Sequence, residues 1–375
     1  MTSNLRRQWP IRDTIVASFP LLTSTLTHVK LILFIRQRGP YERLLRITNA
    51  TLWMESFTDH GKIVLKNCEQ QAKLFLFIFV ILGHASGAGW IFEPLILNMK
   101  ANSSAPDDRH LPTEVIVGVP LFESPNYEII FAIDVLGVYI ITILYFCFDY
   151  YLVLVNIFIA GQFEILKRRF ATIYSVKSVQ LMRESQKNMQ NGPINDIFKE
   201  FKDCVMQHQF LIFIVDEIES IYNFMNLVEV IMISLIICLV SYPLLMPGSA
   251  LTVVKNGVFV CSCLVQLFTF ILSCHNIMVS SSDLSNGIYF SRWYENYQDI
   301  GRSLSTSFMI VFVRTQCPCY ITAWGFFPIT MDTLKSELLE GWGWQQSDQM
   351  LPWDHRQLCS TLGSLIINAS WCIEF

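Results

Sequence analysis

The sequence of 375 residues has little charge, since Asp, Glu, Lys and Arg make up only 15% of it. Soluble domains usually carry about 25% charged residues. Hydrophobic residues reach 52%, the net charge is only −4, and no basic tract is long enough to indicate nucleic-acid binding. The composition therefore argues against a soluble enzyme and excludes a disordered or fibrous chain. It predicts an all-α, polytopic helical membrane protein.

The sequence also lacks the motifs of common enzymes and metal sites. It has no phosphate-binding loop, no nucleophile elbow and no His-Glu-x-x-His. Eleven cysteines are scattered without a Cys-x-x-Cys pair, and Cys317 and Cys319 flank Pro318 without the further ligands that zinc requires. We therefore predict no enzymatic activity, no cofactor and no metal site.

Apolar runs predict five to six membrane spans, because a spanning helix needs about 20 mostly apolar residues. A sixth run, 308–331, contains Arg314, Gln316 and two prolines, so it is a weaker candidate. The run 129–160 would be about 48 Å long as one helix, and we expect it to tilt or to project beyond the bilayer. The five stronger runs are 14–35, 74–97, 129–160, 227–246 and 257–280.

Basic residues between the runs predict the orientation of the chain. Six Lys and Arg lie in 36–71 and eight in 161–226, but only two in 98–128. The positive-inside rule then places 36–71 and 161–226 in the cytoplasm and 98–128 outside. The basic stretch 1–13 conflicts with this assignment, because parity places it outside. Either 14–35 does not span or an upstream span is missing; a cleaved signal peptide fits less well, because the 22-residue run 14–35 is too long.

Several stretches, in order, resemble the insect odorant receptor family. They are "DTIVASFPLLTSTLTHVKLILFI" with "YERLL", then "SPNYEIIFAIDVLGVYIITILYFCFDYYLVLVNIFIAGQFEILKRRF", then "CVMQHQFLIFIVDEIESIYNFMNLVEVIMISLIICLV". "LVQLFTFILSCHNIMVSSSDLSNGIYFSRWYE" and "RTQCPCYITAWGFFPITMDTL" follow. Together the stretches cover roughly residues 13–340, and one includes a Gly-Gln-x-x-x-Leu at Gly161, Gln162 and Leu166.

The resemblance implies a fold and a function. Members of the family have seven membrane helices and a cytoplasmic N-terminus, and they form hetero-tetramers with a shared co-receptor. Seventh helices line a cation pore, and small volatile odorants bind in the outer half of each tuning subunit. The implied location is the plasma membrane of the olfactory sensory neuron dendrite, where the subunit is multi-pass and surrounded by lipid.

Two departures from the family pattern concern the ends of the sequence. The resemblance leaves no counterpart for the first membrane segment, so we expect a transmembrane domain over 1–340 that lacks that helix. Residues 341–375 are polar and contain Pro352 where the pore-lining half of the seventh helix is expected. We interpret this tail as atypical, as from an error in the gene model or a degraded gene, and a subunit with it would bind odorant without conducting.

The pocket candidates are aromatic and polar residues in the spans, because an odorant site needs apolar walls with few polar groups. For each of them, simple packing between helices is the competing interpretation. Asp149 is the most unusual, since a charge inside a span needs a partner, and we expect a structural polar contact. The pocket candidates are Phe19, Thr23, Ser86, Trp90, Phe131, Tyr139, Asp149 and Tyr242.

Three further predictions concern packing, assembly and modification. Lys30, near the inner end of its run, is expected to extend toward the cytoplasm. Gly83 and Gly87 form a Gly-x-x-x-Gly that favours close helix packing over a ligand-filled void. Asn102 begins a glycosylation sequon in the outer loop. The resemblance also implies a subunit-assembly surface at the start of the seventh helix, formed by Arg314, Gln316, Pro318, Gly325 and Phe327.

The leading hypothesis is therefore an odorant receptor subunit that gates a non-selective cation channel with its co-receptor. A G-protein-coupled chemoreceptor would have the opposite orientation and an Asp-Arg-Tyr after its third helix, which is missing here. A secondary transporter would show internal repeats, and none is visible. A non-functional receptor fragment is the remaining alternative, because of the atypical tail.

Overall fold

The computed structural model describes residues 11–51, 59–100, 111–113, 124–173, 192–245, 250–291, 293–294 and 302–333. Apart from a two-stranded hairpin, the regular structure of these residues is helical, which confirms the predicted all-α class. The elements are α1 (Ile11–Arg36), α2 (Arg38–Thr51), α3 (Asp59–Lys100), α4 (Asn126–Thr172), α6 (Gly192–Leu245), α7 (Ala250–Phe290), α9 (Arg302–Thr315), β1 (Thr322–Ala323) and β2 (Phe327–Pro328).

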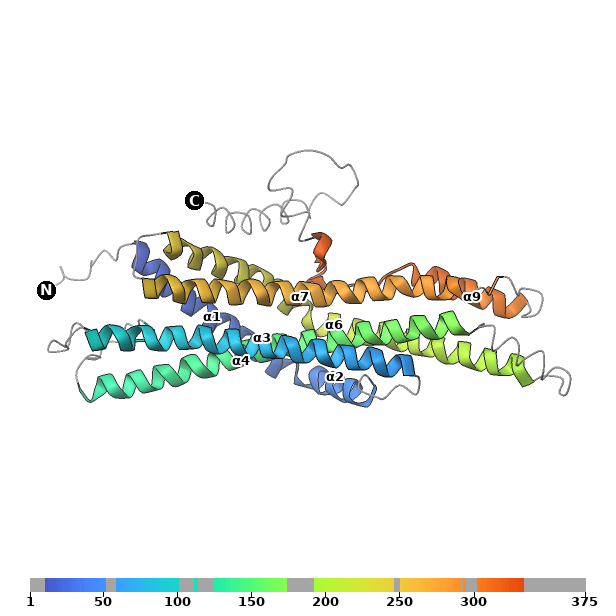
Figure 1. The fold of residues 1–375 in the computed structure, drawn as a ribbon, viewed down its shortest axis with the longest axis horizontal. Coiled ribbons are helices and arrows are strands. Elements are labelled where there is room, and N and C mark those ends of the chain that lie inside the picture. Colours follow the sequence, from blue (N-terminus) through green and yellow to red (C-terminus); the bar gives the residue numbers. More distant parts are fainter. Residues whose placement is uncertain are drawn as a thin grey trace, which may run out of the picture.

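The long helices form an elongated bundle (Figure 1). α4 and α7 pack against each other, α3 contacts both of them, and α6 contacts α1, α4 and α7. α2 lies beside α6 near the middle of the bundle, and α9 lies beside the C-terminal end of α7. The C-terminal end of α3 and the N-terminal end of α4, which flank the connector predicted to be outside, lie at the opposite end of the bundle from the C-terminal end of α4 and the N-terminal end of α6 (Figure 1).

Among the described residues, four helices are long and apolar enough to cross a membrane. They are Asp59–Met99, Asn126–Thr172, Phe198–Ser241 and Ala250–Phe290. The predicted run 14–35 lies in α1, which is not one of these four. α4 contains 47 residues, so at about 1.5 Å per residue it is about 70 Å long. The run 129–160 therefore lies within one helix that is longer than the bilayer core, and its tilt or projection beyond the bilayer stays a prediction.

The run 308–331 is not a continuous membrane helix, so its prediction as a sixth span was wrong. α9 ends at Thr315, and β1 and β2 then form an antiparallel hairpin that pairs Thr322 with Pro328. Pro318 disfavours helical geometry in the residue before it, which explains why the helix stops there. The turn between the strands uses left-handed backbone at Trp324 and Gly325, with φ of 51° and 71°.

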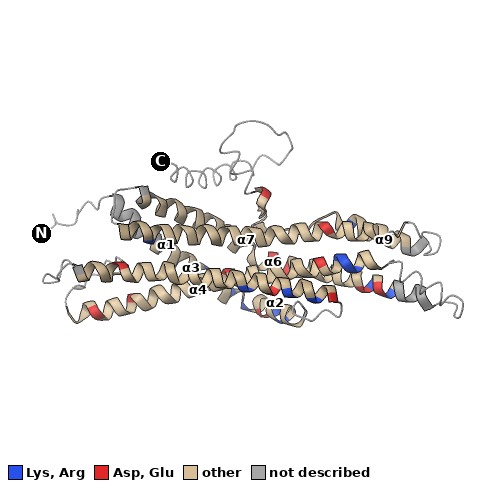
Figure 2. Cartoon of the chain, viewed as in Figure 1, with Lys and Arg blue, Asp and Glu red and all other residues tan. Residues whose placement is uncertain are grey.

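The four candidate spans differ in how much of their apolar surface is covered by protein. In the most apolar window, 61% of α6 and 56% of α7 is buried, against 17% of α3 and 6% of α4. Within these windows, α3 and α4 therefore leave most of their apolar side chains uncovered by the rest of the described chain. Lys and Arg gather in the half of the bundle that holds α2 and α9, and the other half is nearly free of them (Figure 2). This distribution agrees with the predicted orientation.

The Gly-x-x-x-Gly of α3 serves close packing at its first glycine. A Cβ at Gly83 would lie 2.9 Å from the ring of Phe146 on α4, which is too close for a real side chain. At Gly87 the nearest atom is the hydroxyl of Thr142, at an ordinary 3.6 Å. The prediction of close helix packing is therefore confirmed at Gly83.

Candidate functional site

A buried ion cluster lies where α1, α4, α6 and α7 meet. The Lys30 ammonium of α1 lies 2.6 Å from Oδ1 of Asp149 on α4 and 2.5 Å from Oε2 of Glu229 on α6. None of the Lys30 side chain is exposed, and both carboxylates are buried. One lysine is thus held between two acids inside the bundle.

Two neutral residues complete this cluster. The side-chain amide of Gln266 on α7 donates to Asp149, and it lies 3.3 Å from Oε1 of Glu229. The Lys30 ammonium also lies 4.6 Å from the centre of the Tyr145 ring, a cation–π distance. We name Lys30, Tyr145, Asp149, Glu229 and Gln266 the ion cluster.

The ion cluster corrects one prediction and confirms another. Lys30 does not extend to the cytoplasm, because Asp149 and Glu229 provide a closer compensating charge inside the bundle. Asp149 makes the structural polar contact that was expected for it. Removing one partner of a buried pair typically costs several kcal/mol, about 3–5, because an uncompensated charge remains. The cluster therefore fixes how the four helices lie relative to one another.

A second polar contact lies at the outer ends of α3 and α7. Glu93 accepts hydrogen bonds from Lys255 and from the Thr252 hydroxyl, the latter at 2.7 Å. The Lys255 ammonium lies 3.9 Å from the centre of the Trp90 ring. Lys255 is buried and is neutralised by Glu93, so this contact ties the two helices together without adding net charge.

The structure does not bring those predicted pocket residues whose side chains it describes into one place. Ser86 is buried on α3 and Trp90 packs under Lys255, whereas Asp149 belongs to the ion cluster. Tyr139 is 47% exposed and stacks on the exposed His84, so it lies on an outward face of α3 and α4.

The remaining pocket candidates are less informative. Phe131 packs on Tyr127 near the outer end of α4, with ring centres 5.8 Å apart. Thr23 is partly buried on α1. The side chains of Phe19 and Tyr242 lie outside the described residues, as do Asn102 and the tail 341–375. Their predicted roles stay predictions.

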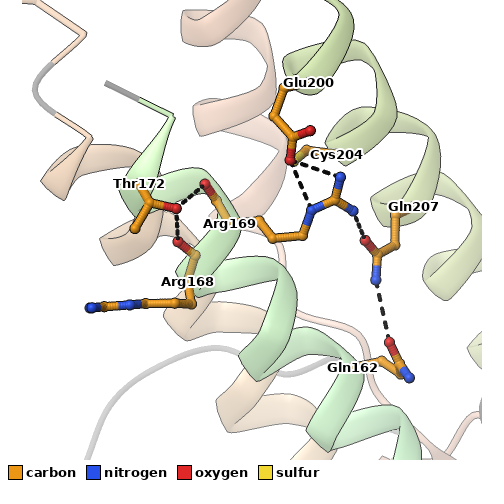
Figure 3. Close-up of polar contacts among 7 residues, drawn as sticks. All are labelled: Gln162, Arg168, Arg169, Thr172, Glu200, Cys204 and Gln207. Atoms are coloured by element: carbon orange, nitrogen blue, oxygen red, sulfur yellow. Dashed lines mark hydrogen bonds and ion pairs between the residues drawn. The ribbon is translucent and has the colours of Figure 1, made fainter. Parts of the chain in front are cut away.

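The C-terminal part of α4 and the N-terminal part of α6, which are predicted to be cytoplasmic, are joined by a polar network (Figure 3). The Arg169 guanidinium donates to Glu200 at 2.8 and 3.0 Å and to Gln207 at 2.6 Å, and Gln207 donates to Gln162 at 3.3 Å. Phe170 and Phe201 pack beside this network. These contacts hold the C-terminal part of α4 against the N-terminal part of α6.

The segment after α9 is anchored on the cytoplasmic part of α6 and α7. Glu219 accepts hydrogen bonds from the backbone and the hydroxyl of Thr322, and the Trp324 backbone donates to the Asn223 carbonyl at 3.1 Å. The Cys319 backbone donates to the Ser281 hydroxyl at 3.0 Å. These contacts position the hairpin from residues that sequence reasoning did not single out.

The predicted assembly residues lie on the outer side of this segment. Arg314, Gln316 and Gly325 are exposed, and Pro318 and Phe327 are partly buried. Large apolar side chains of α9 and the hairpin are exposed around them, a signal that the prediction missed. Those side chains are Met309, Ile310, Val313, Tyr320 and Trp324.

Comparisons with known proteins place this architecture among odorant receptors. The chain is 22% identical to Odorant receptor Or2 of Anopheles gambiae over 61% of this chain, which spans 58% of that relative's length. It is 20% identical to Odorant receptor 10 of Aedes albopictus over 90% of this chain and 84% of the relative.

A solved structure has the same fold. The olfactory receptor OR5 of Machilis hrabei, in complex with eugenol, superposes with a TM-score of 0.67 at 16% identity and covers 96% of this chain and 83% of its own. The family model described as 7tm Odorant receptor matches residues 11–338. Since this family model covers most of the chain, and the chain has four helices apolar enough to span a membrane among its described residues, the chain belongs to the odorant receptor family of helical membrane proteins.

Proposed function

We propose that this chain is the odorant-binding subunit of a cation channel that it forms with a co-receptor. Its ligands would be small volatile molecules bound between the outer halves of the helices. The observation that carries the proposal is the ion cluster. It joins α1, α4, α6 and α7 at one level, between their proposed outer halves and their proposed cytoplasmic extensions. The proposed site of action is the plasma membrane of the olfactory neuron dendrite.

Gating would work through a shift between two helix arrangements. A ligand that binds the open arrangement more tightly increases its population, and no further force is needed. Lys30, Asp149 and Glu229 come from three different helices, so a relative movement of those helices changes their distances. The cluster would thereby relay ligand binding to the cytoplasmic half.

Assembly with the co-receptor is proposed to use the outer side of α9 and the hairpin. Ile310 and Val313 are 65% and 58% exposed, and Trp324 is 55% exposed. Arg314 lies among them and offers a charge for orientation. Aromatic residues and Arg are enriched at protein interfaces, which supports this surface.

The test is co-expression with the co-receptor and recording of odorant-evoked current. We expect current only when both subunits are present. A matched chain whose residues after 340 are replaced by the corresponding helix of a relative tests the proposed role of the tail. If, with the co-receptor present in both cases, the replaced chain gives current and the native chain gives none, the native chain would be a fragment that binds without conducting. A response that requires GTP in the pipette would contradict the proposal and favour a G-protein-coupled receptor.

Tags at Lys62 and Lys187 test the orientation separately. They should be labelled only after the cells are permeabilised, since both positions lie in the basic connectors. Labelling on intact cells would overturn the assigned topology, and with it the channel proposal.

A further inference from the structure

Asn256 is a buried polar residue whose side chain has no hydrogen-bond partner in the described part of the chain. It is 1% exposed, and neither Nδ2 nor Oδ1 makes a hydrogen bond. An amide taken out of water without partners is costly, and most buried polar side-chain atoms in proteins are hydrogen-bonded. A buried amide whose donor, Nδ2, and acceptor, Oδ1, are both unpaired therefore needs an explanation.

Other buried amides of the described chain show what is usual in this fold. The Asn156 amide donates to the Ser273 hydroxyl at 3.0 Å, and the Asn226 amide donates to the Thr322 carbonyl at 3.3 Å. Gln266 donates to Asp149 within the ion cluster. Each of the three uses its N–H donors to join helices or to hold the hairpin. The Asn256 side chain makes no such hydrogen bond to another helix, so it differs from these three structural amides.

Asn256 lies on the interior stripe of α7, toward the outer end of the helix. Cys263 and Phe270 follow it at seven-residue spacing, which keeps all three on nearly one face, and they are 2% and 4% exposed. Gln266 is ten residues further along the chain, so the ion cluster lies about 15 Å deeper along the axis. The unpaired amide thus belongs to the outer half of the bundle interior.

The neighbouring Lys255 is already paired. It points to α3, where it contacts Glu93, Trp90 and Gly89. Since Glu93 neutralises Lys255, this pair adds no net charge beside Asn256. The Asn256 side chain itself offers a neutral donor group and a neutral acceptor.

We infer that Asn256 is the hydrogen-bonding contact for the polar group of a neutral, oxygenated odorant such as an alcohol, ketone or ester. The inference rests on the proposed function, because it assigns the ligand class of that same outer site. The Nδ2 group would donate to the ligand oxygen, and Oδ1 would accept from a hydroxyl where the ligand has one. Hydrocarbons would gain nothing from this residue, whereas a carboxylate could accept from Nδ2 but would lack a free compensating cation, since Lys255 is paired with Glu93.

The probes are heptane, 2-heptanone, 1-heptanol and heptanoate, applied to cells that express the full chain with the co-receptor. Asn256→Leu keeps the side-chain size but removes both hydrogen-bonding groups, whereas Asn256→Thr keeps a hydroxyl. Ser241→Ala is the matched control, because the Ser241 hydroxyl already bonds to the Ile237 carbonyl of its own helix. Biotin labelling of the cell surface checks the amount of each variant.

In N256L the half-maximal concentration for 2-heptanone and 1-heptanol should rise about 10-fold, which corresponds to about 1.4 kcal/mol. The response to heptane should be unchanged, N256T should recover part of the loss, and S241A should equal the native chain. Equal losses for heptane and the oxygenated probes would overturn the inference, because Asn256 would then be structural. No change for any probe would overturn it as well.

A second readout does not depend on current. The purified full chain should melt at a higher temperature with 2-heptanone or 1-heptanol than with heptane, and N256L should lose this difference. Stabilisation without current would contradict the channel proposal and leave the ligand assignment intact. Absence of stabilisation by both oxygenated probes would overturn the assignment itself.

Discussion

The two halves of α4 belong to the same helix but to different environments. Between residues 126 and 148 only Tyr145 is buried, although the segment is strongly apolar. From Asp149 to Phe170 thirteen residues are buried, and only Arg168 is exposed. Hydropathy is therefore a poor guide to packing in a membrane protein, since lipid accepts apolar side chains as readily as protein does.

The change of environment along α4 coincides with the ion cluster. Asp149 is the first residue of the buried half, and the cluster joins α4 to three other helices at that level. On the C-terminal side of Asp149, α4 is largely covered by other helices, and on the N-terminal side it offers more surface to its surroundings. A loosely packed half of the helix suits ligand binding and helix movement. A tightly packed half suits the transmission of that movement and contact with another subunit.

The largest effect is expected at the cluster itself. Lys30→Met should lower the free energy of unfolding by about 3–5 kcal/mol, because Asp149 and Glu229 would remain buried without a compensating cation. Thermal unfolding of the purified chain measures this. Adding Asp149→Asn and Glu229→Gln to the same variant should recover much of the loss. A single variant as stable as the native chain would show that the cluster does not hold the helices together.

The next largest effect contrasts the two halves of α4 directly. Ile159 is fully buried, so Ile159→Ala should cost about 2–5 kcal/mol through lost contacts and a cavity. Ile133 is 64% exposed on the same helix, and Ile133→Ala should change stability by less than about 0.5 kcal/mol. Denaturant or thermal unfolding compares them, and similar costs for both would refute the division of α4.

Glycine positions give a smaller but sharper contrast. A Cβ at Gly161 would lie 2.5 Å from Sγ of Cys68 on α3, whereas nothing lies within 4 Å of a Cβ at Gly137. Gly161→Ala should therefore destabilise by about 1–3 kcal/mol through overpacking. Gly137→Ala should stabilise by up to about 1 kcal/mol through helix propensity. Melting temperatures that move in the same direction would contradict this comparison.

The smallest effect concerns polar contacts at the cytoplasmic end. Arg169→Gln should cost about 1 kcal/mol, since Arg169 loses bonds to Glu200 and Gln207 in a partly exposed place. Lys73→Gln removes an exposed pair with Glu69 within α3 and should cost about 0.3 kcal/mol. The free energy of unfolding of both variants is measured at low and at high salt. A larger loss of stability from K73Q than from Arg169→Gln would contradict this order.

The sequence predicted the helical class, the long helix at 129–160 and the close packing at Gly83. Each of these depends on local composition or spacing. The pairing of Lys30 with Asp149 and Glu229 was missed, although each charge in an apolar run was visible. The available signal was that one basic and two acidic residues lie inside three different apolar runs, where each charge needs a partner. The run 308–331 misled because apolar content alone does not distinguish a short helix with a hairpin from a span.

By itself, the amino-acid sequence showed that this protein is a helical membrane protein and which family it resembles, and it predicted which connectors face the cytoplasm. Those properties follow from the cost of burying charge and from the order of motifs along the chain. Only the tertiary structure decided that Lys30 is enclosed, that one half of α4 is packed and the other offered to lipid, and that Asn256 lacks a partner. These properties depend on which helices meet at a given depth, and no local spacing in the chain specifies that.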